Sequence, residues 1–489
     1  MNPNLFNENP FAQFSAEEEQ EIIDTIFYEP PYYSSLVSTL TKNSSRFLLG
    51  QRGDGKSFII YKLFNDLSQK RTLPILITRY DDIPLTNNEN HFLYTILYNL
   101  TIEISKQLLK NPKKKRKLTR YQKGEFATIL KLFYTTDFCN EFIDTAKSIK
   151  QIKSKNFIKK IYNCYVIHVL NKIINTAINV GVDVISGSLG LPSTESVVEK
   201  NYLNSIELED IAKYSKEDII NLPKDKLVSI LHILCDIAET IEYSSIVVLF
   251  DKIDEFQRIN ADVNKITDFC LEILTDTDLL LSNKISIVFS LWSEIKRSLN
   301  SRGVRFDKFS DIDVQLSDEG LVKLLNKRLS YFSNNIVTFE SLIPYENSRK
   351  DILFVADKSP RTLIKLLSEI YICDFSNEKN SFDEKSISKG LILFCKKFDY
   401  ESLLSKGRND LISWINKLLR IRQHTFTIQM MLEPLALNSK NAQRYIIEME
   451  KIGLIKLLDE TAPDGQNVYK VEDHRIRYLI SKGVISLDD

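Results

Sequence analysis

The 489-residue sequence carries no net charge, because 65 lysines and arginines balance 65 aspartates and glutamates. This balance excludes a chain-wide electrostatic attraction to nucleic acid or to an anionic membrane, although a local basic patch can still bind either one. Apolar residues make up 43% of the chain and charged residues 27%, a composition typical of globular proteins. At roughly 100–200 residues per domain, this length predicts about three domains.

Cysteine and histidine are scarce. None of the six cysteines lies in a Cys-x-x-Cys pair, so we expect reduced core thiols in a cytoplasmic protein and neither a zinc site nor a disulfide framework. The five histidines lack metal-ligand spacing, and no pattern typical of a nuclease, protease or deaminase is present. Lys172 and Asp183 interrupt the most membrane-like stretch, residues 166–191, and residues 1–20 do not resemble a secretory signal, so no membrane attachment is expected.

Glycine is scarce as well, with 14 residues, yet three of them lie close together at 50, 53 and 55. Residues 50–57, GQRGDGKS, match the phosphate-loop pattern G-x-x-x-x-G-K-[ST], with a strand-like run before them and helical spacing after them. Glycine allows the backbone amides to wrap around a pyrophosphate, since a Cβ would block this approach. We therefore predict that the nucleotide is bound by Gly50, Gln51, Arg52, Gly53, Asp54, Gly55, Lys56, Ser57 and Phe58. Lys56 would reach the β- and γ-phosphates as a catalytic residue, and Ser57 would ligate Mg²⁺.

A second acidic site is expected where a buried strand ends. Residues 246–250 form a continuous apolar run, which ends at Asp251 and is followed by Asp254 and Glu255. Ligands of parallel α/β sheets bind at the carboxyl ends of the strands, which predicts that these acids face the phosphate loop. Asp251 is predicted to contact Mg²⁺ through water, and Asp254 or Glu255 is predicted to polarise the attacking water.

Further strands at 73–80 and 284–292 predict an α/β fold with a doubly wound parallel P-loop NTPase sheet. The segments around the sheet add the expectation of a long helical insert, a helical lid and a C-terminal winged helix. The expected units are an N-terminal segment with the first half of the ATPase core (1–80), a mostly helical insert (81–243), the second half of the core (244–316), the lid (317–400) and the winged helix (401–489). The insert contains a basic run, Lys113 to Lys117, that suits contact with nucleic acid phosphates, contact with an acidic partner, or a solvated loop.

Two elements after the core have the periodicity of helical domains. Amphipathic helices at 318–332, 361–375 and 386–398 predict the lid. The segment after them has the order helix, helix, strand, turn, strand and helix, which resembles a winged helix. Its second helix carries Lys440, Arg444 and Lys451 together with acidic residues, so both a DNA contact and a protein contact stay open.

The GQRGDGKS loop, the LFDKIDE block (249–255) and the SPRTLIKLL segment (359–367) together resemble the AAA+/STAND group of P-loop ATPases. The closest likeness is to ATPases similar to origin-recognition proteins in bacterial phage-defence loci. This resemblance implies a nucleotide contact by Pro360 and Arg361 of the lid. It also implies a polar sensor at Ser290 or Ser293, near Trp292, and an arginine finger at Arg302 or Arg305.

The function that the resemblance implies is that of an ATP-binding and hydrolysing switch ATPase. It would be the ATPase of an anti-phage defence system, would form a homo-oligomer and would act with a separate effector protein. A DNA-binding initiator or loader is the alternative, and a nucleotide-dependent scaffold with little turnover is a third. No base-reading motif separates ATP from GTP.

Overall fold

The central sheet of the molecule is parallel and five-stranded. The structure, a computed structural model, describes residues 5–111, 113–133, 216–259, 262–374, 379–403 and 410–488. Strand order is β2-β3-β4-β1-β5, and every neighbouring pair runs parallel. The strands are β1 (Arg46–Gly50), β2 (Thr72–Ile77), β3 (Ser245–Phe250), β4 (Ile285–Trp292) and β5 (Asp311–Asp313). The predicted α/β class with a doubly wound parallel sheet is confirmed.

Two details of the sheet differ from the prediction. The second strand ends at Ile77 and not at residue 80, because Tyr80 turns its hydroxyl back onto the ends of β2 and β3. The fifth strand was not predicted, since three residues with two aspartates give no strand signal. It forms because β1 needs a partner on its outer edge, where Leu48 pairs with Ile312.

Alternating residues of the strands face two hydrophobic layers. One layer packs α2 and α3 against Leu48, Val247 and Leu249, and the other packs α4, α11, α12 and α14 against the opposite face. Both faces are covered, which explains why β3 and β4 are buried along their whole length. The helices of this part are α1 (Ile23–Ile26), α2 (Tyr33–Leu40), α3 (Lys56–Ser68), α4 (Glu89–Lys110), α5 (Arg120–Phe133), α10 (Lys216–Ile220), α11 (Lys224–Thr240), α12 (Val263–Thr275), α13 (Thr277–Leu280) and α14 (Ile295–Ser301).

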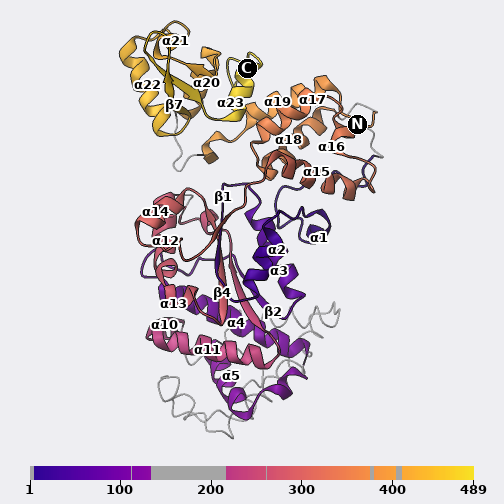
Figure 1. The fold of residues 1–489 in the computed structure, drawn as a ribbon, viewed down its shortest axis with the longest axis vertical. Coiled ribbons are helices and arrows are strands. Elements are labelled where there is room, and N and C mark those ends of the chain that lie inside the picture. The colour runs from indigo at the N-terminus through magenta and orange to yellow at the C-terminus, as the bar shows by residue number, and fades with distance from the viewer. Residues whose placement is uncertain are drawn as a thin grey trace, which may run out of the picture.

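The described part of the predicted insert is helical. It consists of α4, a short 3₁₀ turn at Lys114–Lys117, α5, α10 and α11, and residues 134–215 lie outside the described residues. These helices lie at the end of the molecule opposite the C-terminus (Figure 1). The basic run is partly paired, since Lys117 contacts Glu242 and the Lys114 ammonium lies 4.1 Å from the centre of the Tyr243 ring.

The helices after the core form one continuous hydrophobic cluster with the C-terminal unit. The three helices predicted for the lid are present as α15 (Asp318–Phe332), α18 (Pro360–Cys373) and α19 (Glu384–Lys397). Two helices that were not predicted, α16 (Phe339–Leu342) and α17 (Glu346–Ala356), lie between α15 and α18 in the chain, and all five are here called the lid helices. The C-terminal elements are α20 (Leu411–Ile421), β6 (Thr425–Phe426), α21 (Ile428–Leu432), α22 (Ser439–Lys451), β7 (Ile455–Thr461), β8 (Asn467–Val471) and α23 (His474–Ser481). The expected order of helices and hairpin is observed, with β6 completing a three-stranded sheet of order β6-β8-β7.

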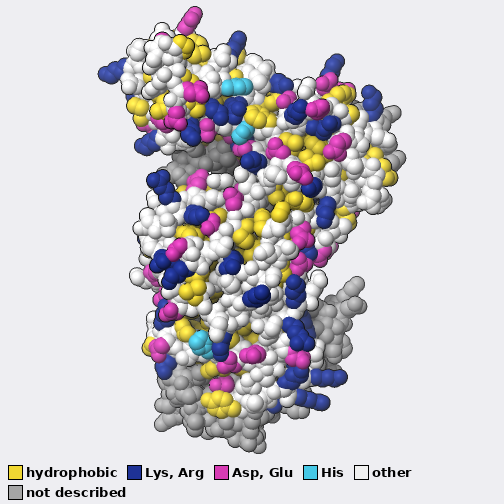
Figure 2. Space-filling model, viewed as in Figure 1, with side chains coloured by type: hydrophobic (Ala, Val, Ile, Leu, Met, Phe, Trp, Pro, Cys, Tyr) yellow, Lys and Arg dark blue, Asp and Glu magenta, His cyan; other side chains and the backbone are white. Residues whose placement is uncertain are grey.

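The N-terminal segment crosses from the lid helices to the core. Phe6 and Phe11 are buried in the lid cluster, whereas Phe27 is buried in the layer that covers α3. The lid helices and the C-terminal unit lie together beyond the end of the sheet at which β1 leads into α3 (Figure 1). Basic and acidic side chains are interspersed over the face seen in Figure 2. No helix among the described residues is long and apolar enough to cross a membrane, and no cluster of metal-ligand side chains occurs among them.

Candidate functional site

The phosphate-loop sequence forms an open backbone cradle between β1 and α3. β1 ends at Gly50, and α3 begins at Lys56 directly after Gly55. Gly53 and Gly55 have φ angles of +96° and +91°, which L-residues with a Cβ rarely adopt. The loop also has no room at Gly53, because a Cβ there would lie 2.8 Å from Ser359 Oγ. The glycines are therefore required by the backbone at this place.

Gln51 is the residue around which the loop is organised. Its backbone N–H donates to Asp54 Oδ2 at 2.6 Å, and its carbonyl accepts from Lys56 Nζ at 3.0 Å. Trp292, at the end of β4, donates from Nε1 to the Gln51 side-chain oxygen. Lys56 also donates to the Gly50 carbonyl at 2.9 Å, so this lysine is buried against the loop backbone. Burial raises the pKa of Asp54, while its hydrogen bond from Gln51 and the nearby Lys56 act in the opposite direction.

The acidic residues predicted after β3 lie beside this cradle. Asp251 is 1% exposed, and Lys252 turns the chain in the left-handed region before a 3₁₀ turn that carries Asp254 and Glu255. Tyr80 lies with its hydroxyl 2.7 Å from the Asp251 carbonyl and 2.9 Å from that of Ile77, which holds the end of β3 against β2. We call residues 251–255 the acid loop.

Asp251 has an unusual electrostatic environment. Burial raises its pKa, whereas the neighbouring hydroxyls of Ser290 and Ser57 lower it. Within the described part of the chain, neither Asp251 Oδ2 nor Ser290 Oγ has a partner with hydrogen-bond geometry, although both atoms are buried. Buried polar atoms without partners are costly, and a bound cation beside Ser57 would satisfy this carboxylate. The residues present thus fit the predicted Mg²⁺ ligands.

The predicted lid residues contact the tip of the phosphate loop. α18 begins at Pro360, with Ser359 as its N-cap, and Ser359 Oγ donates to the Gly53 carbonyl at 3.2 Å. The Arg361 backbone N–H donates to the same carbonyl at 3.3 Å. The positive end of α18 and the Arg361 side chain therefore lie at the mouth of the cradle.

A single pocket joins the cradle, the acid loop and α18. Its lining includes Arg52 to Phe58 from the cradle, Asp251, Asp254 and Glu255 from the acid loop, and Pro360 and Arg361 from the lid helices. Gly50 and Gln51 lie outside this lining, because they form the root of the loop beside Trp292. The predicted phosphate-loop, metal and lid residues thus meet at one place.

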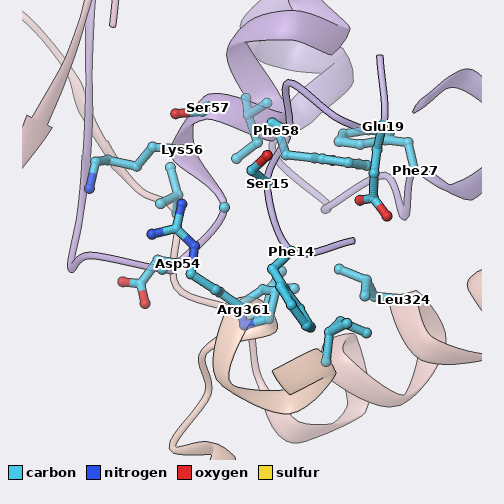
Figure 3. A pocket seen from close by; sticks show the side chains of 18 of the residues that line it. Phe14, Ser15, Glu19, Phe27, Asp54, Lys56, Ser57, Phe58, Leu324 and Arg361 are labelled. Atoms are coloured by element: carbon cyan, nitrogen blue, oxygen red, sulfur yellow. The ribbon is translucent and has the colours of Figure 1, made fainter. Parts of the chain in front are cut away.

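The N-terminal segment contributes a wall of the pocket that was not predicted from the sequence. Phe14, Ser15, Glu19 and Phe27 line the pocket, and in Figure 3 their side chains lie across it from Asp54 and Lys56. The aromatic residues of this otherwise polar and acidic segment were the sequence feature that could have indicated that it packs against the core. No periodicity marks where such a segment will pack, so the sequence did not assign it to the site.

Other predicted residues do not reach the pocket. Arg302 pairs with Asp268 at 2.5 Å, and Arg305 forms two hydrogen bonds with Asp307 at 2.6 and 2.8 Å. Both arginines are thus held by carboxylates of their own chain. Of the two serine candidates, Ser290 lies buried near Asp251, whereas the backbone N–H of Ser293 donates to the Gly50 carbonyl at 3.4 Å.

Comparisons with known proteins add a weak likeness. No family model matches the sequence, and no curated protein is similar to it. Among solved structures, the chain is similar to the ORC2 protein of Aeropyrum pernix in ADPNP–ADP complexes, with 11% identity, coverage of 98% of both chains and a TM-score of 0.40. It is also similar to a Walker-type ATPase of Pyrococcus abyssi, with 13% identity, coverage of 98% and 99%, and a TM-score of 0.36. A third similar structure is Cdc6p of Pyrobaculum aerophilum, with 10% identity, coverage of 94% of this chain and 95% of that chain, and a TM-score of 0.33. Similarities this low transfer neither a ligand nor a residue role.

Proposed function

We propose that this protein binds and hydrolyses ATP with Mg²⁺. The observation that carries the proposal is the convergence of three separate segments on one pocket: a glycine cradle with Lys56 and Ser57, the acid loop after β3, and Arg361 at the start of α18. A phosphate-binding loop alone supports binding only. Carboxylates beside it supply what a hydrolysis site needs in addition.

The functional residues of the pocket have different roles in the proposed reaction. The amides of the cradle and the N-terminus of α3 bind the phosphates, and Lys56 exchanges its contacts with Gly50 and Gln51 for phosphate oxygens. Ser57 and Asp251 hold Mg²⁺, which neutralises phosphate charge when bound. Asp254 or Glu255 accepts a hydrogen bond from the attacking water, and Arg361 binds the phosphates from the lid side.

We further propose that hydrolysis makes the chain a switch of the AAA+/STAND type. The hydrogen bonds from Ser359 and Arg361 to Gly53 support this, because any ligand that displaces the cradle also acts on α18. By its resemblance to defence ATPases, the protein would form a homo-oligomer and control a separate effector in an anti-phage system. A tightly bound nucleotide with negligible turnover would instead indicate a scaffold.

The test is steady-state ATP and GTP hydrolysis with Mg²⁺, with or without duplex DNA, together with nucleotide binding by a fluorescent analogue. We expect Lys56→Ala and Asp251→Ala to lower turnover at least ~100-fold, the scale for losing one residue that stabilises transition-state charge. Lys70→Ala and Asp278→Ala are matched controls, because both side chains are exposed and outside the pocket. If the Lys56→Ala and Asp251→Ala variants both keep the turnover of the wild type, the assignment of the site is refuted.

A second candidate, a DNA-binding initiator or loader, is favoured by one feature of α22. Lys440, Arg444 and Lys451 are exposed on this helix, which precedes the β7–β8 hairpin as in a winged helix. DNA binding through these residues predicts an affinity that falls steeply with salt and weakens in an Arg444→Ala variant. Affinity that is equal in Arg444→Ala and wild type would exclude this helix as the contact.

A further inference from the structure

The N-terminal segment carries two glutamates that pair with cations of two other elements, both of which line the pocket. Glu17 pairs with Lys252 of the acid loop, and Glu19 pairs with Arg328 of lid helix α15 at 2.5 Å. Only one residue separates the two glutamates in sequence. A short stretch of chain therefore connects the lid helices to the acid loop.

The contact with the lid is buried and combines an ion pair, in which Glu19 Oε1 lacks a partner with hydrogen-bond geometry among the described residues, with two hydrogen bonds from Arg328 to backbone carbonyls. The side chains of Arg328 and Glu19 are 4% and 6% exposed. Arg328 also donates from Nε to the Pro10 carbonyl and from Nη2 to the Gln13 carbonyl at 3.2 Å. Three contacts from one guanidinium, together with the buried Phe11 ring, hold the N-terminal segment against α15.

The contact with the acid loop is made next to the proposed catalytic carboxylates. Lys252 stands between Asp251 and Asp254 and adopts a φ of +64°, so a change in its position turns the loop. Burial acts to raise the pKa of Glu17, but hydrogen bonds from Lys252, from the backbone and from Ser15, together with the charge of Lys252, outweigh it and the pKa is lowered. The pair is therefore charged near neutral pH.

The residues just before Glu19 form a hydrogen-bonded turn, part of which lines the pocket. Glu18 accepts hydrogen bonds from Ser15 Oγ at 2.9 Å and from the backbone N–H groups of Phe14 and Ser15 at 3.3 and 3.2 Å. These bonds close a turn, and Ser15 and Ala16 in this turn line the pocket. A closed turn transmits displacement better than an extended tether does.

We propose that residues 13–19 are a coupling segment, in which Glu17 and Glu19 are positioning residues that tie the position of the acid loop to that of α15. Nucleotide entering the pocket displaces the segment, α15 follows through Arg328, and the acid loop follows through Lys252. The catalytic consequence rests on the proposed ATPase function, whereas the mechanical coupling does not.

The test compares Glu17→Gln with the double variant Glu19→Gln/Arg328→Met, and Glu21→Gln is the control because Glu21 is exposed on the same segment. The double variant removes both buried charges, so no unpaired ion is left in the interior. Hydrogen–deuterium exchange is measured for residues 251–256 and for α15, alongside kcat and KM for ATP.

We expect the double variant to speed exchange in residues 251–256 by at least about five-fold, the effect of losing roughly one hydrogen bond's worth of restraint. We also expect a lower kcat at nearly unchanged KM, with Glu21→Gln equal to wild type. Faster exchange that is confined to α15 and the N-terminal segment would overturn the coupling.

A double variant that fails to fold leaves Glu17→Gln to decide. Coupling is reciprocal, so releasing Lys252 must also speed exchange in α15 around Arg328, and unchanged exchange there would overturn the proposal. A wild-type protein without turnover would contradict the ATPase function alone, because the exchange measurements still decide the coupling.

Discussion

Substituting Gly53 by alanine separates the backbone requirement of the phosphate loop from its contact with the lid helices. Gly55→Ala is the matched control, because both glycines have φ near +90° and an alanine pays about 1–2 kcal/mol in that region at either place. Only Gly53 has a close neighbour. Its new Cβ would lie 2.8 Å from Ser359 Oγ, whereas the nearest atom to a Cβ on Gly55 is Pro360 Cγ at 3.8 Å.

The extra cost of Gly53→Ala follows from this collision. Ser359 must move and lose its hydrogen bond to the Gly53 carbonyl, which adds about 1–2 kcal/mol. At about 2–4 °C per kcal/mol for a unit of 150–250 residues, the thermal midpoint should fall roughly 2–8 °C further than in Gly55→Ala. The assay is thermal unfolding without nucleotide, so that phosphate contacts do not enter.

Ser359→Gly allows a double-mutant cycle, because it removes the atom with which the new Cβ collides. Glycine at the N-cap of α18 costs only a few tenths of a kcal/mol. In the Ser359→Gly background, Gly53→Ala and Gly55→Ala should lower the midpoint equally. Equal losses already in the wild-type background, or an excess loss that persists with Ser359→Gly, would refute the reasoning that the lid helices press on the loop at Gly53.

Three further predictions concern Trp292 and Tyr80, which make hydrogen bonds at the strand ends, and Cys235 in α11. Trp292→Phe removes the hydrogen bond to the Gln51 side chain and should raise KM for ATP about five-fold, the equivalent of ~1 kcal/mol. An unchanged KM would show that Trp292 does not support the phosphate loop. Tyr80→Phe keeps the ring but removes the hydrogen bond to the Asp251 carbonyl, so kcat should fall several-fold. Tyr33→Phe is the control, because it loses a phenolic hydrogen bond away from the acid loop, and equal kcat values for the two variants would refute a role of Tyr80 in holding the acid loop. Burial raises the pKa of Cys235 to about 12, so its thiol should stay protonated and react slowly with a disulfide reagent at pH 8 until the protein unfolds. Rapid labelling of Cys235 itself in the native protein, located by peptide mapping because Cys373 is partly exposed, would contradict this.

The parts of the site that could be predicted are those with a local physical cause. The glycine spacing of the phosphate loop and the apolar run before Asp251 each encode a backbone need or a burial need within a few residues. The helix that starts at Pro360 is similar, since proline and its N-cap serine mark a helix start. The strand at Asp311–Asp313 has no such signal, because it is short and pairs only where β1 offers a free edge.

What the amino-acid sequence determined by itself is therefore a P-loop α/β core with its phosphate loop, its acid loop and a helical region after it. Only the tertiary structure decided that the N-terminal segment walls the pocket, that Trp292 holds Gln51, and that Glu17 and Glu19 meet Lys252 and Arg328. These partners are far apart in the chain, and which of them meet depends on strand order and helix packing. A periodic pattern reports which face of an element is buried, but it carries no information on what that face will contact.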